Sequence, residues 1–169
     1  VTYNVAPTWN YGSPKFSKPD PVWGCDAGAA LEGLLLDINM SDNSHYVQVE
    51  IIFAVPACGP VSFSMYDIND DSFNAWQDKV EISATNSVSA AITPSASIGG
   101  FSSYVDNYTN GNTRVIVSKP SVTNATCWED AWITIGGSSD NIKTITIKYS
   151  SAIASKSNPA RQYIIISNL

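Results

Sequence analysis

The residues whose types and spacing could do chemistry gather in one acidic stretch near the middle of the chain. Asp67, Asn69 and Asp71 alternate along it, and Asp78 stands at the twelfth position of the segment that begins at Asp67. Carboxylate and carbonyl oxygens are the ligands that Ca²⁺ prefers. The spacing matches an EF-hand loop in part, with Ser72 where that loop has glycine and an Asp where it has a bidentate Glu.

Strand phase gives a reason for a cation in this stretch. Alternation through residues 61–69 predicts that Asp67 and Asn69 continue the apolar row of the preceding strand, and Asp78 leads the apolar row of the next one. A bare charge there is costly and needs a cation, a basic side chain or backbone amides. The sequence therefore predicts one Ca²⁺ bound by the four side chains. The alternative is an acidic turn in which backbone N–H groups cap Asp67.

Aromatic residues beside polar ones form the second candidate site. Its members are Trp76, Tyr104, Asp106, Asn107, Tyr108, Trp128 and Trp132. Flat rings next to Asp and Asn fit sugar recognition, because C–H faces stack on rings and sugar hydroxyls need planar acceptors. Tyr104 and Tyr108 are expected in one polar loop, and Trp132 falls on the outward phase of its strand. The alternative is that these rings cover the ends of a small domain.

Catalytic constellations are weaker than these two sites. His45 is the only histidine, and no Gly-x-Ser-x-Gly segment accompanies it. Carboxylate pairs such as Glu129–Asp130 could serve a glycosidase, but fifteen acidic residues produce such pairs by chance. We therefore predict that the chain is not an enzyme.

The elements that must position these residues are β-strands, because apolar residues recur with a period of two. The alternating stretches are residues 46–53, 61–65, 80–84, 88–92, 115–117, 131–135 and 144–149. The run 163–166 is apolar on both faces and is expected to be a central strand. Short strands with polar turns predict one all-β domain over residues 1–169, a jelly-roll-like β-sandwich of about eight to ten strands.

Two segments depart from this alternation. Residues 1–23 are rich in proline and are expected to form an extended lead-in. Residues 26–36 could form a short helix. We favour a strand over residues 34–40 that forms a hairpin with the strand beginning near His45.

Composition excludes several classes of protein. Only 14% of the 169 residues are charged, against roughly 25% in typical globular chains. Nine Lys and Arg against fifteen Asp and Glu give a net charge of −6, so we expect no nucleic-acid binding. Apolar runs of about six residues are too short for a helical membrane span. Abundant Asn, Ser and Thr with few Lys and Glu favour an extracellular or cell-surface protein.

The three cysteines, Cys25, Cys58 and Cys127, are far apart and lack the C-x-x-C spacing of zinc sites. We favour one disulfide with one thiol left over, and the three pairings stay open.

Residues 60–69 (PVSFSMYDIN), followed by residues 76–82 (WQDKVEI), carry a resemblance to a known group of proteins. They resemble β-sandwich modules of large bacterial cell-surface and adhesin proteins, where a strand ends in Asp-Ile-Asp and Asp-x-Val follows. Residues 142–149 and 164–169 are similar to those modules too, and Asn69 stands where their second Asp is usual. The resemblance covers residues 45–169 and implies one domain of a longer, multidomain extracellular chain.

These observations favour a non-catalytic recognition module. We expect it to bind a glycan, or a surface protein of a host or partner cell, through its rim loops, with calcium as support. A structural spacer of a surface fibre is the alternative, and a glycoside-active enzyme is the less favoured third.

Overall fold

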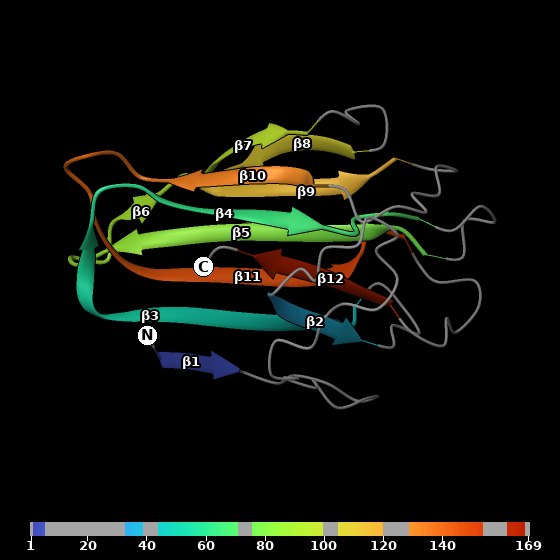
Figure 1. Ribbon diagram of the computed structural model, residues 1–169, viewed down its shortest axis with the longest axis horizontal. Coiled ribbons are helices and arrows are strands. Elements are labelled where there is room, and N and C mark those ends of the chain that lie inside the picture. Colours follow the sequence, from blue (N-terminus) through green and yellow to red (C-terminus); the bar gives the residue numbers. More distant parts are fainter. Residues whose placement is uncertain are drawn as a thin grey trace.

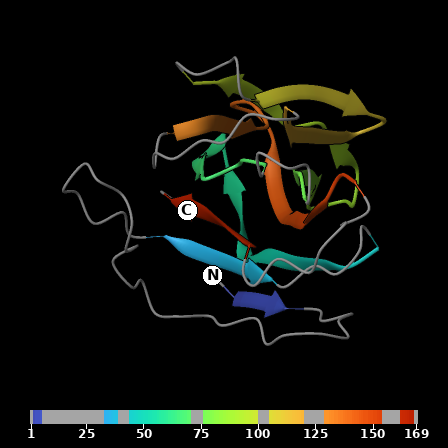
Figure 2. The ribbon, with the colours of Figure 1, turned by 90° about the vertical axis from the view of Figure 1, so that its right-hand side faces the viewer.

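The computed structural model describes residues 2–5, 33–38, 44–70, 76–99, 105–119, 129–153 and 162–167. Within them the chain forms two antiparallel β-sheets that face each other (Figures 1 and 2). No helix occurs in these described ranges. The predicted all-β sandwich is confirmed.

In the described part of the chain, twelve strands build the two sheets. They are β1 (Thr2–Val5), β2 (Leu34–Ile38), β3 (Tyr46–Cys58), β4 (Val61–Tyr66), β5 (Asp78–Asn86), β6 (Ala91–Ile92), β7 (Ser95–Ile98), β8 (Val105–Asn110), β9 (Thr113–Ser118), β10 (Glu129–Ile135), β11 (Asn141–Ser151) and β12 (Gln162–Ser167). Sheet A has the order β1-β3-β11-β5-β9-β8, with β6 paired to β5, and sheet B has the order β2-β12-β4-β10-β7.

The strand order is that of a jelly roll. Eight strands form its two four-stranded halves, β3-β11-β5-β9 in sheet A and β2-β12-β4-β10 in sheet B. The chain crosses between the sheets at each step from β2 to β5 and from β9 to β12, which is the double Greek key of this architecture. β1 extends sheet A at the β3 edge. Strands β6, β7 and β8 are an addition between β5 and β9.

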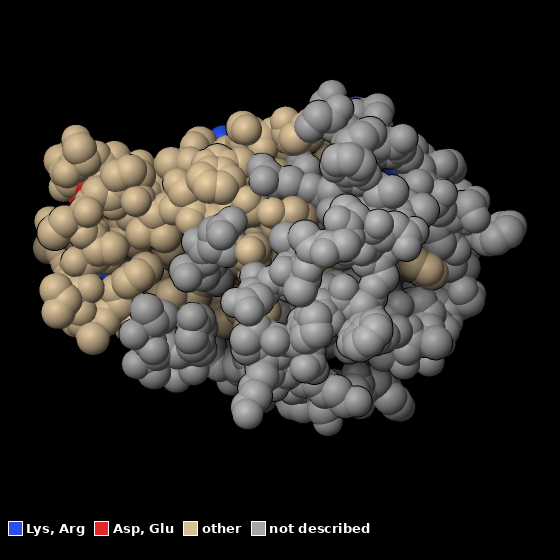
Figure 3. Space-filling view, in the orientation of Figure 1, with Lys and Arg blue, Asp and Glu red and all other residues tan. Residues whose placement is uncertain are grey.

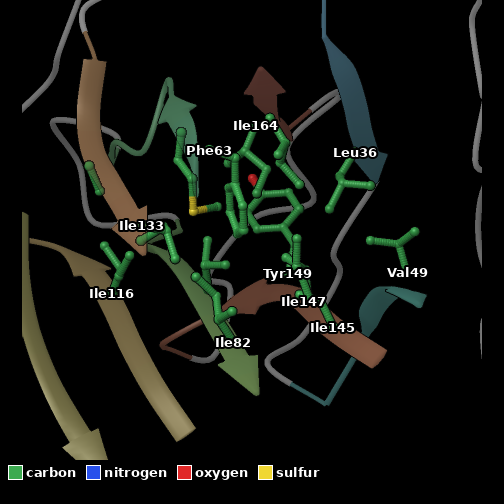
Figure 4. Close-up of a cluster of buried hydrophobic side chains, with 14 of the residues drawn as sticks. Leu36, Val49, Phe63, Ile82, Ile116, Ile133, Ile145, Ile147, Tyr149 and Ile164 are labelled. Carbon is green, nitrogen blue, oxygen red and sulfur yellow. The ribbon is translucent and has the colours of Figure 1, made fainter. Parts of the chain in front are cut away.

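The core lies between the sheets and is built mainly from the predicted alternating rows. β5 shows the pattern well, because Val80 and Ile82 are fully buried while Glu81 between them is half-buried. Side chains from both sheets meet in the middle, where Tyr149 of β11 lies near Phe63 and Ile164 (Figure 4). β12 is buried on both faces and lies between β2 and β4, which confirms the predicted central strand.

The predicted hairpin between residues 34–40 and the strand near His45 is wrong. β2 pairs with β12, with Leu36 opposite Ile164, and β3 belongs to the other sheet. Pairing with β12 places Leu36 in the core between the sheets, where it is only 2% exposed.

The predicted strand over residues 88–92 is mostly a turn. Asn86 Oδ1 accepts hydrogen bonds from the N–H groups of Val88 at 3.1 Å and Ala90 at 2.8 Å, and Ser89 has a φ of 64°. Val88 is 78% exposed. The alternation was misleading because an Asn side chain that binds the backbone two residues on favours a turn over a strand.

Arg114 forms hydrogen bonds at the point where the chain crosses from one sheet to the other. β6 belongs to sheet A and β7 to sheet B, with buried Pro94 between them. Arg114 of β9 donates from Nε to the Pro94 carbonyl at 3.0 Å and from Nη1 to Asn107 Oδ1 of β8 at 3.1 Å. The crossing is therefore joined to both β8 and β9.

The predicted extended lead-in contains a strand at its start. β1 pairs with the outer edge of β3, with Thr2 opposite Ile52. Residues 6–32 lie outside the described part of the chain, and so does most of the segment that could have formed a helix.

Candidate functional site

β4 ends at Tyr66, and the next residue breaks its alternation. Asp67 has a φ of 65°, in the left-handed region that non-glycine residues rarely adopt. The following side chains are shifted by one position, so that Ile68 is fully buried in the core while Asp67 and Asn69 are half-buried. The prediction that Asp67 and Asn69 continue the apolar row is wrong, because this turn resets the phase.

Asp78, the first residue of β5, does lie on the apolar row and is only 2% exposed. Its Oδ1 accepts a hydrogen bond from the Tyr149 hydroxyl at 2.7 Å, and its Oδ2 accepts one from the Asn69 N–H at 3.0 Å. The Asp78 N–H donates in turn to the Asn69 carbonyl at 3.0 Å. These hydrogen bonds offset part of the cost of burying a carboxylate.

Three of the four residues predicted to bind calcium are joined here by hydrogen bonds. Asn69 connects the two carboxylates, since its Nδ2 donates to Asp67 Oδ1 at 2.8 Å and its backbone N–H binds Asp78. Asp71 lies outside the described residues. In the described part of the chain, no three His, Cys, Asp or Glu side chains form a group that could hold a metal ion. Calcium binding stays a prediction.

A second buried carboxylate beside this site was missed by the sequence analysis. Asp70 is 2% exposed and pairs with Gln77 in an isolated antiparallel bridge. The Gln77 side-chain amide donates to the Ser118 carbonyl, and its backbone N–H donates to the Ser151 hydroxyl at 3.3 Å. Together with Asp78 these groups form a buried polar layer at one end of the core. Alternation could not reveal it, because Asp70 and Gln77 lie between strands.

The predicted polar loop around Tyr108 is strand β8, so its residues face two different sides. Asn107 lies on the inward row and accepts the hydrogen bond from Arg114 described above. Asp106 is exposed and forms an ion pair with Lys119 at 3.2 Å. Tyr108 is 50% exposed on the outer face of sheet A. Alternation along β8 thus prevents these residues from forming one cluster.

Trp132 presents a large aromatic ring on the outer face of sheet B. It lies in the middle of β10 and is 39% exposed, whereas Ala131 and Ile133 on either side are fully buried. Its predicted outward orientation is confirmed. Across the sheet it is paired with Ser64 of β4 and Ser97 of β7.

The other aromatic candidates do not join Trp132 in the described structure. Trp76 is half-buried directly before the Gln77 bridge, beside the polar layer. Tyr104 and Trp128 lie outside the described residues. Tyr108 and Trp132 lie on the outer faces of different sheets, so each would be a separate contact surface.

A scan against protein-family models, a search of curated proteins and a search of solved structures gave no match. In the residues that the structure describes, no helix has the length and hydropathy of a membrane span.

Two residues with reactive side chains, His45 and Cys58, lie apart from both candidate sites. His45 is half-buried just before β3. Cys58 is an exposed free thiol at the β3–β4 turn, with its Sγ 3.5 Å from Asn141 Oδ1. The two disulfide pairings that include Cys58 are therefore wrong, and the pairing of Cys25 with Cys127 lies outside the described residues.

Proposed function

We propose that this chain is a non-catalytic, extracellular recognition module that binds a glycan on the outer face of sheet B. The observation that carries the proposal is the exposed Trp132 ring in the middle of β10. An indole held by a strand offers a flat apolar face to the C–H groups of a sugar ring, with little side-chain entropy to lose.

The surroundings of Trp132 support a sugar ligand. Ser97 beside it is exposed, and serine hydroxyls both donate and accept hydrogen bonds, as sugar hydroxyls do. This surface is the face of a sheet, so the proposed contact differs from the rim loops that the sequence favours. The resemblance to bacterial surface modules and the low content of charged residues support an extracellular location within a longer chain.

A glycan microarray probed with the fluorescently labelled protein tests this function. We expect binding to at least one glycan and its loss in Trp132→Ala, with the melting temperature of the variant showing that it is folded. Tyr108→Ala tests the rival surface on sheet A, and we expect it to bind like wild type. Absence of any glycan signal from the folded wild type would contradict the proposal, as would binding that is lost only in Tyr108→Ala. In the first case a protein ligand on the Trp132 face would be the remaining interpretation, and in the second case the glycan site would lie on sheet A.

A second candidate function is that of a structural module in a surface fibre, made rigid by calcium. It is supported by the convergence of Asp67, Asn69 and Asp78 at the end of the sandwich. Carboxylate and amide oxygens with a loop carbonyl and water would supply the oxygen ligands that Ca²⁺ needs. The two functions are compatible, since this site and the Trp132 face lie on different parts of the fold.

A further inference from the structure

The outer face of sheet B carries two rows of hydroxyl groups beside and across from Trp132. In the first row Ser97 of β7 lies next to Trp132, whereas Ser64 of β4 on the other side of Trp132 is fully buried. In the second row Thr134 of β10 lies between Ser62 of β4 and Ser95 of β7. Ser95 and Ser97 are exposed, and Ser62 and Thr134 are half-buried. We call Trp132, Ser62, Ser95, Ser97 and Thr134 the hydroxyl platform.

Three of the five residues of the platform are held in position by hydrogen bonds among themselves. The hydroxyls of Ser62 and Thr134 are 3.2 Å apart and bonded to each other, and Ser95 Oγ donates to the Thr134 carbonyl at 3.1 Å. A hydroxyl has one donor and two acceptor positions, so each keeps capacity for a ligand. Side chains already fixed in position lose little entropy when a ligand binds.

The platform is also free of formal charge, since it consists of serine, threonine and tryptophan. The ion pairs that join Lys79 and Lys148 to Glu81 lie on the outer face of the other sheet. The view of Figure 3 looks onto the sheet B side, where the described surface is almost wholly neutral and charged atoms show only as small spots toward one end and the upper outline. An acidic sugar would find no cation on the platform to compensate the loss of its hydration.

From these observations we infer that the ligand of this face is a neutral glycan chain, bound flat across β10 and β7, with Ser62 of β4 at its edge. The inference rests on the proposed glycan-binding function and adds the chemical class and the contact residues. The row of Ser62, Thr134 and Ser95 spans three strands, about 10 Å, and the row of Trp132 and Ser97 lies about 7 Å along the strands from it, so the patch is larger than one sugar ring. Stacking on Trp132 would place one ring, and the hydroxyls of Ser95, Ser97 and Thr134 would contact the next.

Affinity electrophoresis in native gels tests the chemical class. The gels contain barley β-glucan, dextran or xylan as neutral polymers and polygalacturonate as an acidic one, each at low and at high NaCl. We expect retardation by at least one neutral polymer that NaCl does not change, because no charge is screened. Retardation by polygalacturonate alone that disappears at high NaCl would overturn the neutral class and leave the proposed function standing. Absence of retardation together with an empty microarray would overturn both.

Variants of the platform test the site itself. Removing one hydroxyl in Thr134→Val or Ser97→Ala should weaken binding about three- to tenfold, and Trp132→Ala should weaken it at least about tenfold. Thr146→Val is the matched control, because Thr146 is a half-buried threonine on the outer face of sheet A. Equal affinity of Thr134→Val and Thr146→Val, with only Trp132→Ala impaired, would overturn the hydroxyl platform and leave Trp132 as the contact.

Discussion

At the scale of single residues, the Asp78 carboxylate is almost fully buried and accepts two hydrogen bonds. Replacing Tyr149 by Phe removes the hydroxyl that donates to its Oδ1 at 2.7 Å. Hydrogen bonds to charged groups contribute about 1.5–3 kcal/mol, and a buried acceptor left without its donor carries the full cost. We therefore expect Tyr149→Phe to lower the free energy of unfolding in urea by about 1.5–3 kcal/mol.

The control for that experiment is Tyr108→Phe, which removes a hydroxyl from a half-exposed ring and should change stability by less than about 0.5 kcal/mol. A double-mutant cycle with Asp78→Asn isolates the contact. Asn has one acceptor oxygen and one N–H₂ group, so it cannot accept the hydrogen bonds of both Asn69 and Tyr149. The single variant should therefore also be less stable. Equal costs of Tyr149→Phe in both backgrounds would show that the hydroxyl does not act through Asp78.

The calcium prediction belongs at the same scale. If Ca²⁺ binds at Asp67, Asn69 and Asp78, millimolar CaCl₂ should raise the melting temperature above its value in EDTA. A hundredfold excess of calcium over Kd contributes about 2.7 kcal/mol, which corresponds to roughly 5–10 °C for a chain of this size. Asp67→Ala should abolish the shift, and Asp106→Ala, at an exposed carboxylate paired with Lys119, should keep it. An identical shift in wild type and Asp67→Ala would mean that calcium acts elsewhere, and no shift would mean an ordinary acidic turn.

At the scale of elements, Arg114 determines how firmly the crossing from sheet A to sheet B is held. Arg114→Ala removes two hydrogen bonds, to the Pro94 carbonyl and to Asn107. We expect a loss of about 1–3 kcal/mol in urea unfolding and faster amide hydrogen exchange in β7 and β8. Lys119→Ala breaks an ion pair with the exposed Asp106 and should cost less than about 1 kcal/mol. Uniformly faster exchange across both sheets would contradict a local role for Arg114.

Alanine substitutions at two turn glycines would distinguish the stability cost of a positive φ from the cost of steric crowding. Gly111 has a φ of 59° with open space around it, whereas Gly136 has a φ of 73°. A Cβ on Gly136 would lie 3.1 Å from the Cβ of Asp140 and 3.2 Å from Cδ1 of Ile142. Gly111→Ala should therefore cost roughly 1–2 kcal/mol, and Gly136→Ala roughly 1 kcal/mol or more beyond that. Equal melting temperatures for the two variants would show that the chain relaxes around Gly136 without cost.

The strands that sequence predicts well are those in which burial on one side decides the structure. β5, β10 and β11 alternate cleanly because one face meets the core and the other does not. The predictions that were wrong have local causes, which the alternation of apolar and polar residues does not reveal. Asn86 binds the backbone of the residues after it and turns the chain at Val88, and the positive φ of Asp67 shifts the phase of the residues directly after it, so that Ile68 and not Asn69 is buried.

The candidate site was predictable to a similar extent. The position of Asp78 followed from its strand, and so did the outward orientation of Trp132. What the sequence could not supply was pairing between strands. Only the register brings Tyr149 to Asp78 and places Ser97 and Ser95 beside β10. Hydroxyl residues are too common in this chain for their number alone to indicate a platform.

At the scale of the whole molecule, the free thiol of Cys58 leaves a single disulfide to test. We predict a bridge between Cys25 and Cys127, which would close a loop of about a hundred residues and stabilise the fold by roughly 4–5 kcal/mol on the chain-entropy model. Thiol titration in denaturant without reductant should then find one thiol per chain, rising to three after reduction. Three thiols before reduction would show that the bridge does not exist.

The order of strands in space has a consequence for how this chain reaches its final form. β11 and β12, the last two strands in sequence, fill the gaps between β3 and β5 and between β2 and β4. Until they emerge during synthesis, these earlier strands lack their neighbours, and neither sheet can close. Pairing between residues so distant in sequence is slow. The newly made chain can therefore complete its two sheets only after β11 and β12 have been made, and until then the unpaired edges of the earlier strands are open to aggregation.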